Sequence, residues 1–233
     1  MSESDVKVMS SGGLKAVITA LADAFARASG RKLAPVFAAP AVIKGRIESG
    51  ETVDVAVMTA PLIDALVSQG KLGADTSVEL ARSGLGIAVR KGAPKPDIGT
   101  VEAFRRALLA AKSIVATDPA AGAASGIHFA KLIERLGIAD AVMAKTRLNS
   151  GSYNAEFVAR GEAELAIQQI SEILPVKGAE LVGPLPADVQ ATTVFKAAIG
   201  ANAPQPAAAR ELIAFLKSPA AAHVITASGM EPA

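Results

Sequence analysis

The most constraining feature of this chain is a strand pattern that runs directly into a helix through a turn of serines and glycines. Val6-Lys7-Val8-Met9 alternates as a strand does, Ser10-Ser11-Gly12-Gly13 follows, and Leu14 opens an apolar stripe at helical spacing. The first N–H groups of a helix have no partner inside the helix and carry partial positive charge. The turn therefore predicts either a plain helix N-cap or a site for an anion.

The same strand, small turn and helix recur along the chain. Strand patterns end before helices at Ala39-Pro40, at Ser125-Gly126 and at Ser150-Gly151. Such alternation predicts sheets whose parallel strands carry helices on both faces. We therefore predict an α/β protein with two doubly wound, mostly parallel sheet lobes joined by two hinge strands. Residues 1–83 and 193–233 form one lobe, and residues 84–192 form the other.

Composition narrows the classes of function. Lys and Arg total 24, Asp and Glu total 22, no basic run is dense, and aromatic residues make up only 3%. Nucleic acid is therefore excluded as a partner. The chain has no cysteine, and its two histidines, His128 and His223, lie in no metal-spacing motif. We expect neither a metal site nor a cofactor.

The first residues and the apolar runs of the chain indicate the cellular compartment in which the protein works. No apolar run approaches the ~20 residues that a membrane-spanning helix needs, and the first residues lack the pattern of a secretory signal. The sequence as it stands predicts a cytoplasmic protein, or a periplasmic one if a signal peptide has been removed. We expect a monomer.

With these residues laid out, nearly the whole chain resembles the type II solute-binding proteins of ABC transporters, in their molybdate-binding branch. The resemblance begins at the serine turn and continues through these segments: Ile47-Glu48-Ser49-Gly50, Val53-Asp54-Val55-Ala56-Val57, Val89-Arg90-Lys91-Gly92, Asp118-Pro119, Ser125-Gly126, Arg160-Gly161-Glu162-Ala163-Glu164-Leu165-Ala166-Ile167 and Ala214-Phe215-Leu216-Lys217-Ser218-Pro219. It implies a periplasmic-binding-protein fold that holds a small anion in a cleft between the lobes. As part of an ABC-type uptake system, such a protein would have an ABC permease as partner.

The implied ligand site is built from the small turns and from nearby charges. The candidates are Ser10, Ser11, Gly12, Ala39, Lys44, Arg46, Ser125, Gly126, Ser150, Gly151, Tyr153 and Gln169. The second serine of the family falls near Ala39 and its cleft tyrosine at about Gln169, so two hydroxyl donors of a molybdate site are lost. Lys44 or Arg46 would instead suit a planar carboxylate, which favours an organic acid as ligand.

Each candidate also has a purely structural interpretation. Ser125-Gly126 and Ser150-Gly151 would serve close packing of helix on strand, and Tyr153 would simply be half-buried. Lys44 and Arg46 would lie on a solvated helix face. Asp54, flanked by valines, is expected to bind turn backbone if it is buried.

A related group that resembles this branch contains aconitate-type isomerases, which move a double bond in a tricarboxylate. The alternative function is therefore a cytoplasmic isomerase of an unsaturated carboxylic acid. His128 and Glu172 are the candidates to move the proton, because such a base needs a pKa near neutrality. For His128 the structural alternative is an exposed helical residue, and His223 is expected at the surface. A third hypothesis is a cytoplasmic ligand-sensing module.

Overall fold

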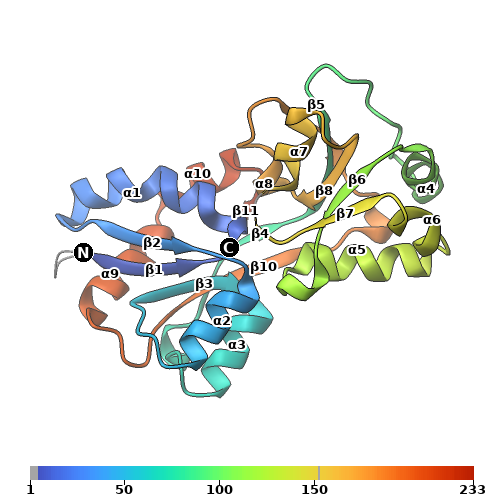
Figure 1. Ribbon diagram of the computed structural model, residues 1–233. Coiled ribbons are helices and arrows are strands. Elements are labelled where there is room, and N and C mark those ends of the chain that lie inside the picture. The colour runs from blue at the N-terminus through green and yellow to red at the C-terminus, as the bar shows by residue number, and fades with distance from the viewer. Residues whose placement is uncertain (1–4, 152) are drawn as a thin grey trace. The chain divides into compact units, whose positions relative to one another are not determined.

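The computed structural model describes residues 5–151 and 153–233, which form two α/β units (Figure 1). One unit runs to Arg82 and resumes at Thr193, and the other comprises Ser83–Thr192. The sequence analysis placed the divisions after residues 83 and 192. The α/β class, with one sheet in each unit, is confirmed.

The first unit combines two stretches of the chain. Its elements are β1 (Val6–Ser10), η1 (Gly12–Leu14), α1 (Lys15–Ser29), β2 (Leu33–Phe37), α2 (Pro40–Glu48), β3 (Val55–Thr59), α3 (Ala60–Ser68), η2 (Ala74–Thr76), β4 (Val78–Ser83), β10 (Thr193–Ile199), α9 (Pro206–Leu216), α10 (Pro219–Ala227) and β11 (Glu231–Pro232).

The sheet of the first unit is mixed rather than parallel throughout. Its strand order is β11-β4-β10-β3-β1-β2. β1 pairs in parallel with β2 and β3, whereas β10 pairs antiparallel with β3 and β11 pairs antiparallel with β4. Strand–helix alternation correctly predicts the three parallel strands, and the antiparallel ones are those that follow or precede the second unit in the chain.

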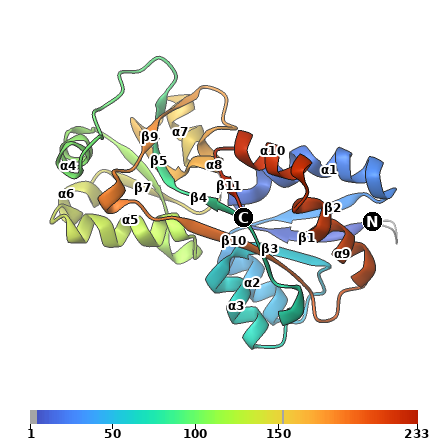
Figure 2. The same ribbon diagram turned by 180° about the vertical axis from the view of Figure 1, so that it is seen from behind.

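Helices cover both faces of this sheet, as Figure 2 shows from behind. On one face α1, α9 and α10 bury a cluster that includes Val8, Phe25 and Leu212. On the other face α2 and α3 bury Ile43 and Ile63. The predicted apolar stripe of the first helix is confirmed, since its side chains are buried in the first of these clusters.

The second unit is a continuous stretch of chain. Its elements are β5 (Leu85–Arg90), α4 (Val101–Ala110), β6 (Ile114–Thr117), η3 (Pro119–Ala121), α5 (Ala124–Arg135), α6 (Ala139–Met143), β7 (Thr146–Asn149), α7 (Asn154–Arg160), β8 (Leu165–Gln169), α8 (Ile170–Ile173), β9 (Ala179–Pro184) and η4 (Ala187–Val189).

The second sheet repeats the mixed pattern, with strand order β7-β6-β8-β5-β9. β6 pairs in parallel with β7 and β8, and β5 pairs antiparallel with β8 and β9. α4, α5 and α6 pack on one face of this sheet, and α7 and α8 pack on the other. Two cores of this kind give each unit its own hydrophobic interior.

Among the elements that were not expected from the sequence are β9, α6 and β11. β9 ends in a proline and contains Gly183, a composition that is poor for strands, yet as an edge strand it pairs on one side only. α6 and β11 are short, with five and two residues, so no periodicity could reveal them. α5 begins at Ala124, so it includes the Ser125-Gly126 pair that the sequence analysis places ahead of the helix.

Candidate functional site

In each unit the carboxyl ends of three parallel strands gather small and polar residues at one edge of the sheet. In the first unit these ends are Ser10, Phe37 and Thr59, and Ser10 lies in register with both neighbouring strands. In the second unit they are Thr117, Asn149 and Gln169. Ligands of open α/β sheets bind at such edges, so these turns are where a site is expected.

The serine turn of the first unit is buried and held mainly by backbone. The Ser10 hydroxyl donates to the carbonyl of Ser11 over 3.0 Å, and the Ser11 N–H donates to the carbonyl of Val57 over 3.2 Å. Ser11 is the N-cap of η1, but its side chain accepts no hydrogen bond from the described N–H groups of that turn. The plain N-cap interpretation therefore does not account for this serine.

Glycine is required in the same turn at Gly13. A Cβ at that position would lie 2.4 Å from the ring of Phe195 on β10. Because real side chains do not approach so closely, only glycine lets η1 settle on the sheet. The turn is thus fixed between β1, β3 and β10, with Gly12 at its centre.

The next turn lacks the hydroxyl that the molybdate-binding pattern supplies. Ala39 is the N-cap of α2, its carbonyl accepts from Val42 and Ile43, and Pro40 occupies the first helical turn. Proline suits that position because its missing N–H would have no helical partner there. Ala39 therefore contributes backbone to this edge and no hydroxyl.

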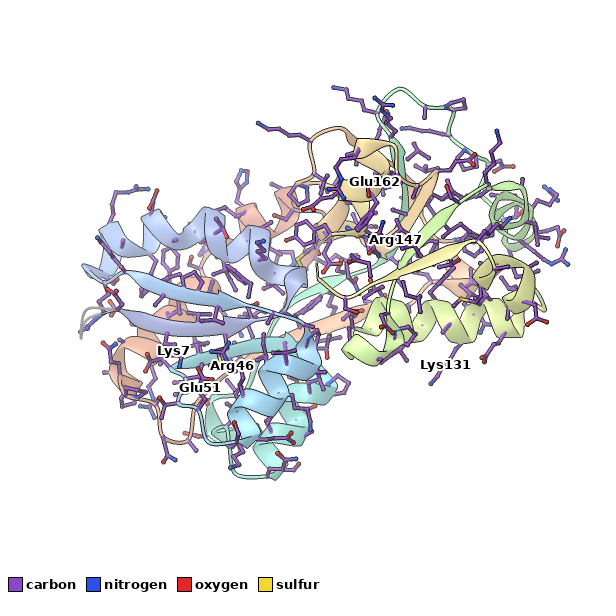
Figure 3. The ribbon with its side chains drawn as sticks, in the orientation of Figure 1. Lys7, Arg46, Glu51, Lys131, Arg147 and Glu162 are labelled. Carbon is purple, nitrogen blue, oxygen red and sulfur yellow. The ribbon has the colours of Figure 1, made fainter. Side chains whose placement is uncertain are left out.

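The two cations proposed for this turn are engaged elsewhere. Lys44 forms an ion pair with Glu48 one turn along α2. Arg46 donates through Nε and Nη2 to the carboxylate of Glu51, both over 2.6 Å, and Glu51 also accepts from Lys7 Nζ over 2.8 Å (Figure 3). These bonds hold the pKa of Glu51 at about 2 and raise that of Arg46.

This cluster lies at the wrong end of the sheet for a ligand contact. Lys7 is near the start of β1, and Glu51 precedes β3, so the cluster occupies the amino edge. α2 starts at the carboxyl edge and runs back, which carries Arg46 away from Ser10. The structure therefore does not bring Arg46 to the serine turn, and it places Lys44 in the ion pair with Glu48.

In the second unit a buried asparagine joins three strand ends. Asn154, the first residue of α7, is 1% exposed. Its Nδ2 donates to Thr117 Oγ1 over 3.0 Å and to the Ile167 carbonyl over 2.9 Å, while its Oδ1 accepts from Asn149 Nδ2 over 2.9 Å. A satisfied buried network of this kind fixes the edge rigidly.

The Ser125-Gly126 turn is attached to the same network. Ser125 Oγ donates to Thr117 Oγ1 over 3.3 Å. A Cβ on Gly126 would lie 2.4 Å from the carbonyl oxygen of Thr117, so glycine is needed for α5 to pack against the end of β6. The structure supports close packing as the role of Gly126, which the sequence analysis gave as its alternative.

The second small turn of this unit is bonded to Asp118. Ser150 Oγ donates to Asp118 Oδ2 over 3.3 Å, and Asp118 Oδ1 accepts from the N–H of Ala120 at the start of η3. The Gly151 N–H donates to the Asn149 side chain over 3.3 Å. Ser150 and Gly151 are exposed residues that join neighbouring turns.

Beyond β8, Glu172 is a carboxyl whose pKa is strongly raised. Burial raises the pKa of Glu172 to about 7, and a hydrogen bond from the Gln169 backbone opposes that rise only partly. Glu172 is the third residue of α8, and Gln169 is the N-cap, so this bond belongs to a capping box. A carboxyl near neutrality can both take and give a proton.

Tyr153 shares the surroundings of Glu172. Burial is the first cause that raises the pKa of Tyr153, and the charges of Glu172 and Glu156 raise it further. The phenol therefore keeps its proton and can donate a hydrogen bond. The structure thus brings Tyr153, Gln169 and Glu172 to neighbouring turns of one unit.

Gln168 is a polar residue at this edge that was not among the candidate ligand residues. It is 1% exposed, and its Oε1 accepts from the N–H of Ala155 over 3.2 Å, while its Nε2 has no acceptor among the described residues. The signal in the sequence was the polar pair Gln168-Gln169 at the end of an apolar strand. Asn149 and Asn154, five residues apart around a small turn, were a similar signal for the network.

The other candidate base is committed to a structural contact. His128 Nε2 lies 2.9 Å from the carbonyl of Val189 in η4, so this nitrogen carries a proton and donates it. His223 is exposed, as expected. Asp54 is buried and accepts from the N–H groups of Lys7 and Gln205 over 2.8 and 2.7 Å, which confirms the expected backbone role.

Two features of other classes of function are absent from the residues that the structure describes. No helix within residues 5–151 and 153–233 is long and apolar enough to cross a membrane. The same residues contain no group of three or more His, Asp or Glu side chains that could hold a metal ion.

Comparisons with known proteins agree with this architecture. The family described as "Bacterial extracellular solute-binding protein" matches residues 6–231. A relative named aconitate isomerase, from Pseudomonas sp, is 37% identical over 232 residues, which cover 97% of this chain and 87% of that protein.

Two solved structures show a similar fold. The Azotobacter vinelandii periplasmic molybdate-binding protein has a TM-score of 0.82 at 20% identity, with 97% of this chain and 98% of that one covered. The sulfate-binding protein of Mycobacterium tuberculosis H37Rv has a TM-score of 0.74 at 18% identity, with 98% and 87% covered. At such identities the likeness concerns the fold, which is that of the type II periplasmic binding proteins.

Proposed function

This chain belongs to the bacterial extracellular solute-binding protein family, and within that family we propose that it is an isomerase of an unsaturated tricarboxylic acid. Binding of a small molecule is the function that the family as a whole supports. The finer assignment, a shift of the double bond of an aconitate-type substrate, is supported by one observation above all. Glu172 places a carboxyl with a pKa of about 7 at an edge where a ligand is expected.

The chemistry requires one proton to move between two carbons. A base removes a proton from the CH2 group of the substrate, and the electron pair of that C–H bond spreads over the allylic carbons and the adjoining carboxylate. The same proton, or another from the conjugate acid, then bonds to the former vinyl carbon, and the double bond shifts. The reaction is balanced without any redox partner, so one acid–base group is sufficient.

Glu172 has the properties that this step needs. As a carboxylate it takes the proton, and as a carboxylic acid with a pKa near neutrality it returns the proton. The Tyr153 phenol, which stays protonated, supplies a hydrogen bond to the charge that develops on a substrate carboxylate. His128 is less suited, because its Nε2 donates to Val189.

The whole-chain similarity to aconitate isomerase supports the same substrate class. The match extends over 97% of this chain, so it includes both units and all the turns described above. The absence of a hydroxyl at Ala39, where the molybdate-binding pattern has one, also favours a carboxylate over a tetrahedral oxyanion.

The test is a turnover assay with purified protein. Incubation with trans-aconitate should yield cis-aconitate, which chromatography detects. In D2O, deuterium should enter the product at the newly protonated carbon.

Glu172→Gln should lower kcat by about 10²-fold or more while trans-aconitate still binds, as expected for loss of a general base. Glu162→Gln is the matched control, since Glu162 is an exposed acid bonded to Arg160 (Figure 3 labels Glu162). Full turnover by Glu172→Gln would exclude Glu172 as the base.

The second candidate function is that of an anion receptor in an ABC-type uptake system, with a permease as partner. It is favoured by the family and by the buried serine turn of Ser10 and Ser11, which offers hydroxyl and amide donors. Tight binding of molybdate, sulfate or a tricarboxylate with no isomer exchange would support this receptor and reject the isomerase.

A further inference from the structure

A buried donor at the carboxyl edge of the second sheet lacks an acceptor. Gln168, which is 1% exposed, lies one residue before the end of β8. Its Nε2 has no hydrogen-bond partner within residues 5–151 and 153–233. Because a buried N–H group loses its bonds to water on folding, leaving it unpaired destabilises the native state. Such a group in a native protein therefore requires an explanation.

Turning the amide round would not give this group a partner. Gln168 Oε1 accepts from the N–H of Ala155 over 3.2 Å. If Oε1 and Nε2 were exchanged, Nε2 would face that N–H, and two donors would meet. The bond to Ala155 therefore fixes the orientation of the amide, and the NH2 group is the end that is left over in the described part of the chain.

The NH2 group belongs to the same corner of the second unit as the residues of the proposed reaction. Side chains alternate along a strand, so Gln168 faces the side of the sheet where Ala166 packs with α7 and α8 (Figure 1). Its Oε1 is bonded to the second residue of α7, and Tyr153 immediately precedes that helix. Glu172 is the third residue of α8, which follows β8 directly.

Two neighbours of Gln168 show why the chain itself leaves this donor over. Gly86, its partner in register on β5, has no side chain that could accept a hydrogen bond. Asn154 Oδ1, the side-chain acceptor next to Ala155, already accepts from Asn149 Nδ2 over 2.9 Å. An acceptor that enters with a ligand would complete the arrangement, and a carboxylate has only acceptor oxygens to offer.

A neutral donor suits a position close to Glu172. Lysine or arginine would bind a carboxylate more strongly, but a cation would also lower the pKa of a neighbouring carboxyl. Glu172 would then return its proton to the substrate less readily. Burial and one backbone hydrogen bond set the pKa of Glu172 at about 7. An amide can bind a carboxylate oxygen without adding a charge that disturbs this value.

We propose that Gln168 Nε2 donates a hydrogen bond to a carboxylate of the substrate at the carboxyl edge of the second sheet. This inference rests on the proposed tricarboxylate substrate and concerns residues of the second unit alone. Gln168 is then a binding residue, so its loss should raise KM more than it lowers kcat. Loss of Glu172, the base, should mainly lower kcat.

The first experiment follows the side-chain NH2 signal of Gln168 by NMR in 15N-labelled protein. The ligand added is tricarballylate, a saturated tricarboxylate that cannot isomerise, and the signal is identified by its absence from Gln168→Met. It should move as the site fills, because its N–H groups gain an acceptor. The side-chain signal of Gln69 is the reference and should stay in place, since Gln69 is exposed and already donates to Glu48.

The second experiment measures the affinity for tricarballylate by titration calorimetry. Gln168→Met should weaken binding by about tenfold or more, as expected for loss of a hydrogen bond to a charged group. Gln69→Met is the matched control. Gln168→Glu keeps an oxygen for the Ala155 N–H but loses the NH2 group, so it should also bind weakly at alkaline pH. Thermal unfolding of each variant shows that binding is compared on folded protein.

The outcomes separate this inference from the proposed function. If the Gln168 signal does not move, or if Gln168→Met binds as tightly as Gln69→Met, the NH2 group serves packing or an ordered water and the inference is wrong. The inference is also wrong if the wild type does not bind tricarballylate. If the signal moves and the affinity falls although no aconitate is turned over, the inference stands and only the isomerase is rejected.

Discussion

The raised pKa of Glu172 has a consequence for stability that is independent of any substrate. Its ordinary value of 4.5 applies to the unfolded chain, and its value in the native protein is about 7. Between these two values the native state keeps a proton that the unfolded state has lost. The free energy of unfolding must therefore fall as pH rises through this window.

The size of the effect follows from the shift itself. One pKa unit corresponds to about 1.4 kcal/mol, so the full loss between about pH 4 and pH 8 is about 3 kcal/mol. Glu172→Gln removes the titration but keeps the side-chain oxygen that accepts the Gln169 N–H. Relative to the wild type, this variant should gain about 3 kcal/mol of stability over that pH range.

The assay is urea unfolding of wild type and Glu172→Gln at several pH values, with the difference in unfolding free energy plotted against pH. Other acids titrate in both proteins, so their contributions cancel in the difference. A difference that stays flat across the window would mean that Glu172 titrates normally. The argument for Glu172 as a proton carrier at neutral pH would then fail.

Three substitutions test the packing. Asp54→Ala should cost about 3 kcal/mol, because it leaves the two N–H groups that bind this buried carboxylate without an acceptor; Asp54→Asn should cost less, and equal losses in urea unfolding would contradict this account. Gly126→Ala should cost about 2 kcal/mol, since its Cβ would lie 2.4 Å from the Thr117 carbonyl; an unchanged melting temperature would show that the turn relaxes easily. Gly45→Ala, inside α2 with open space at its Cβ, should add about 0.5–1 kcal/mol, and calorimetry that finds a loss would refute it.

The sequence predicts most of the fold because its strand and helix patterns are long and flanked by clear signals. Thr100 caps α4 through its side chain, and α9 and α10 each begin at a proline. The antiparallel strands were not predicted individually, since alternation of strand and helix indicates only the strands that run parallel to their neighbours. β10 shows this well, because its apolar pattern suits either direction.

The candidate site is predicted less completely than the fold. Its residues lie in turns, and the partners of a side chain often come from distant parts of the sequence. Ser10 and Ser11 were found from their turn, and Glu172 from its residue type. Lys44 and Arg46 were chosen for their charge. Glu48 follows Lys44 at i+4, a pairing that helical spacing indicates, whereas the contact of Arg46 with Glu51 depends on the turn after α2.

The first unit consists of two stretches of chain on either side of the second unit. This arrangement sets the order in which the two units are completed as the chain leaves the ribosome. All strands of the second sheet are made before residue 193, so that unit can fold early. The first sheet has its β1, β2 and β3 much sooner, but β10, α9 and α10, which complete its larger hydrophobic cluster, come last. Until then Val8, Val55 and Val57 lack the cover of α9 and α10, so the unit whose strands are synthesised first is completed last.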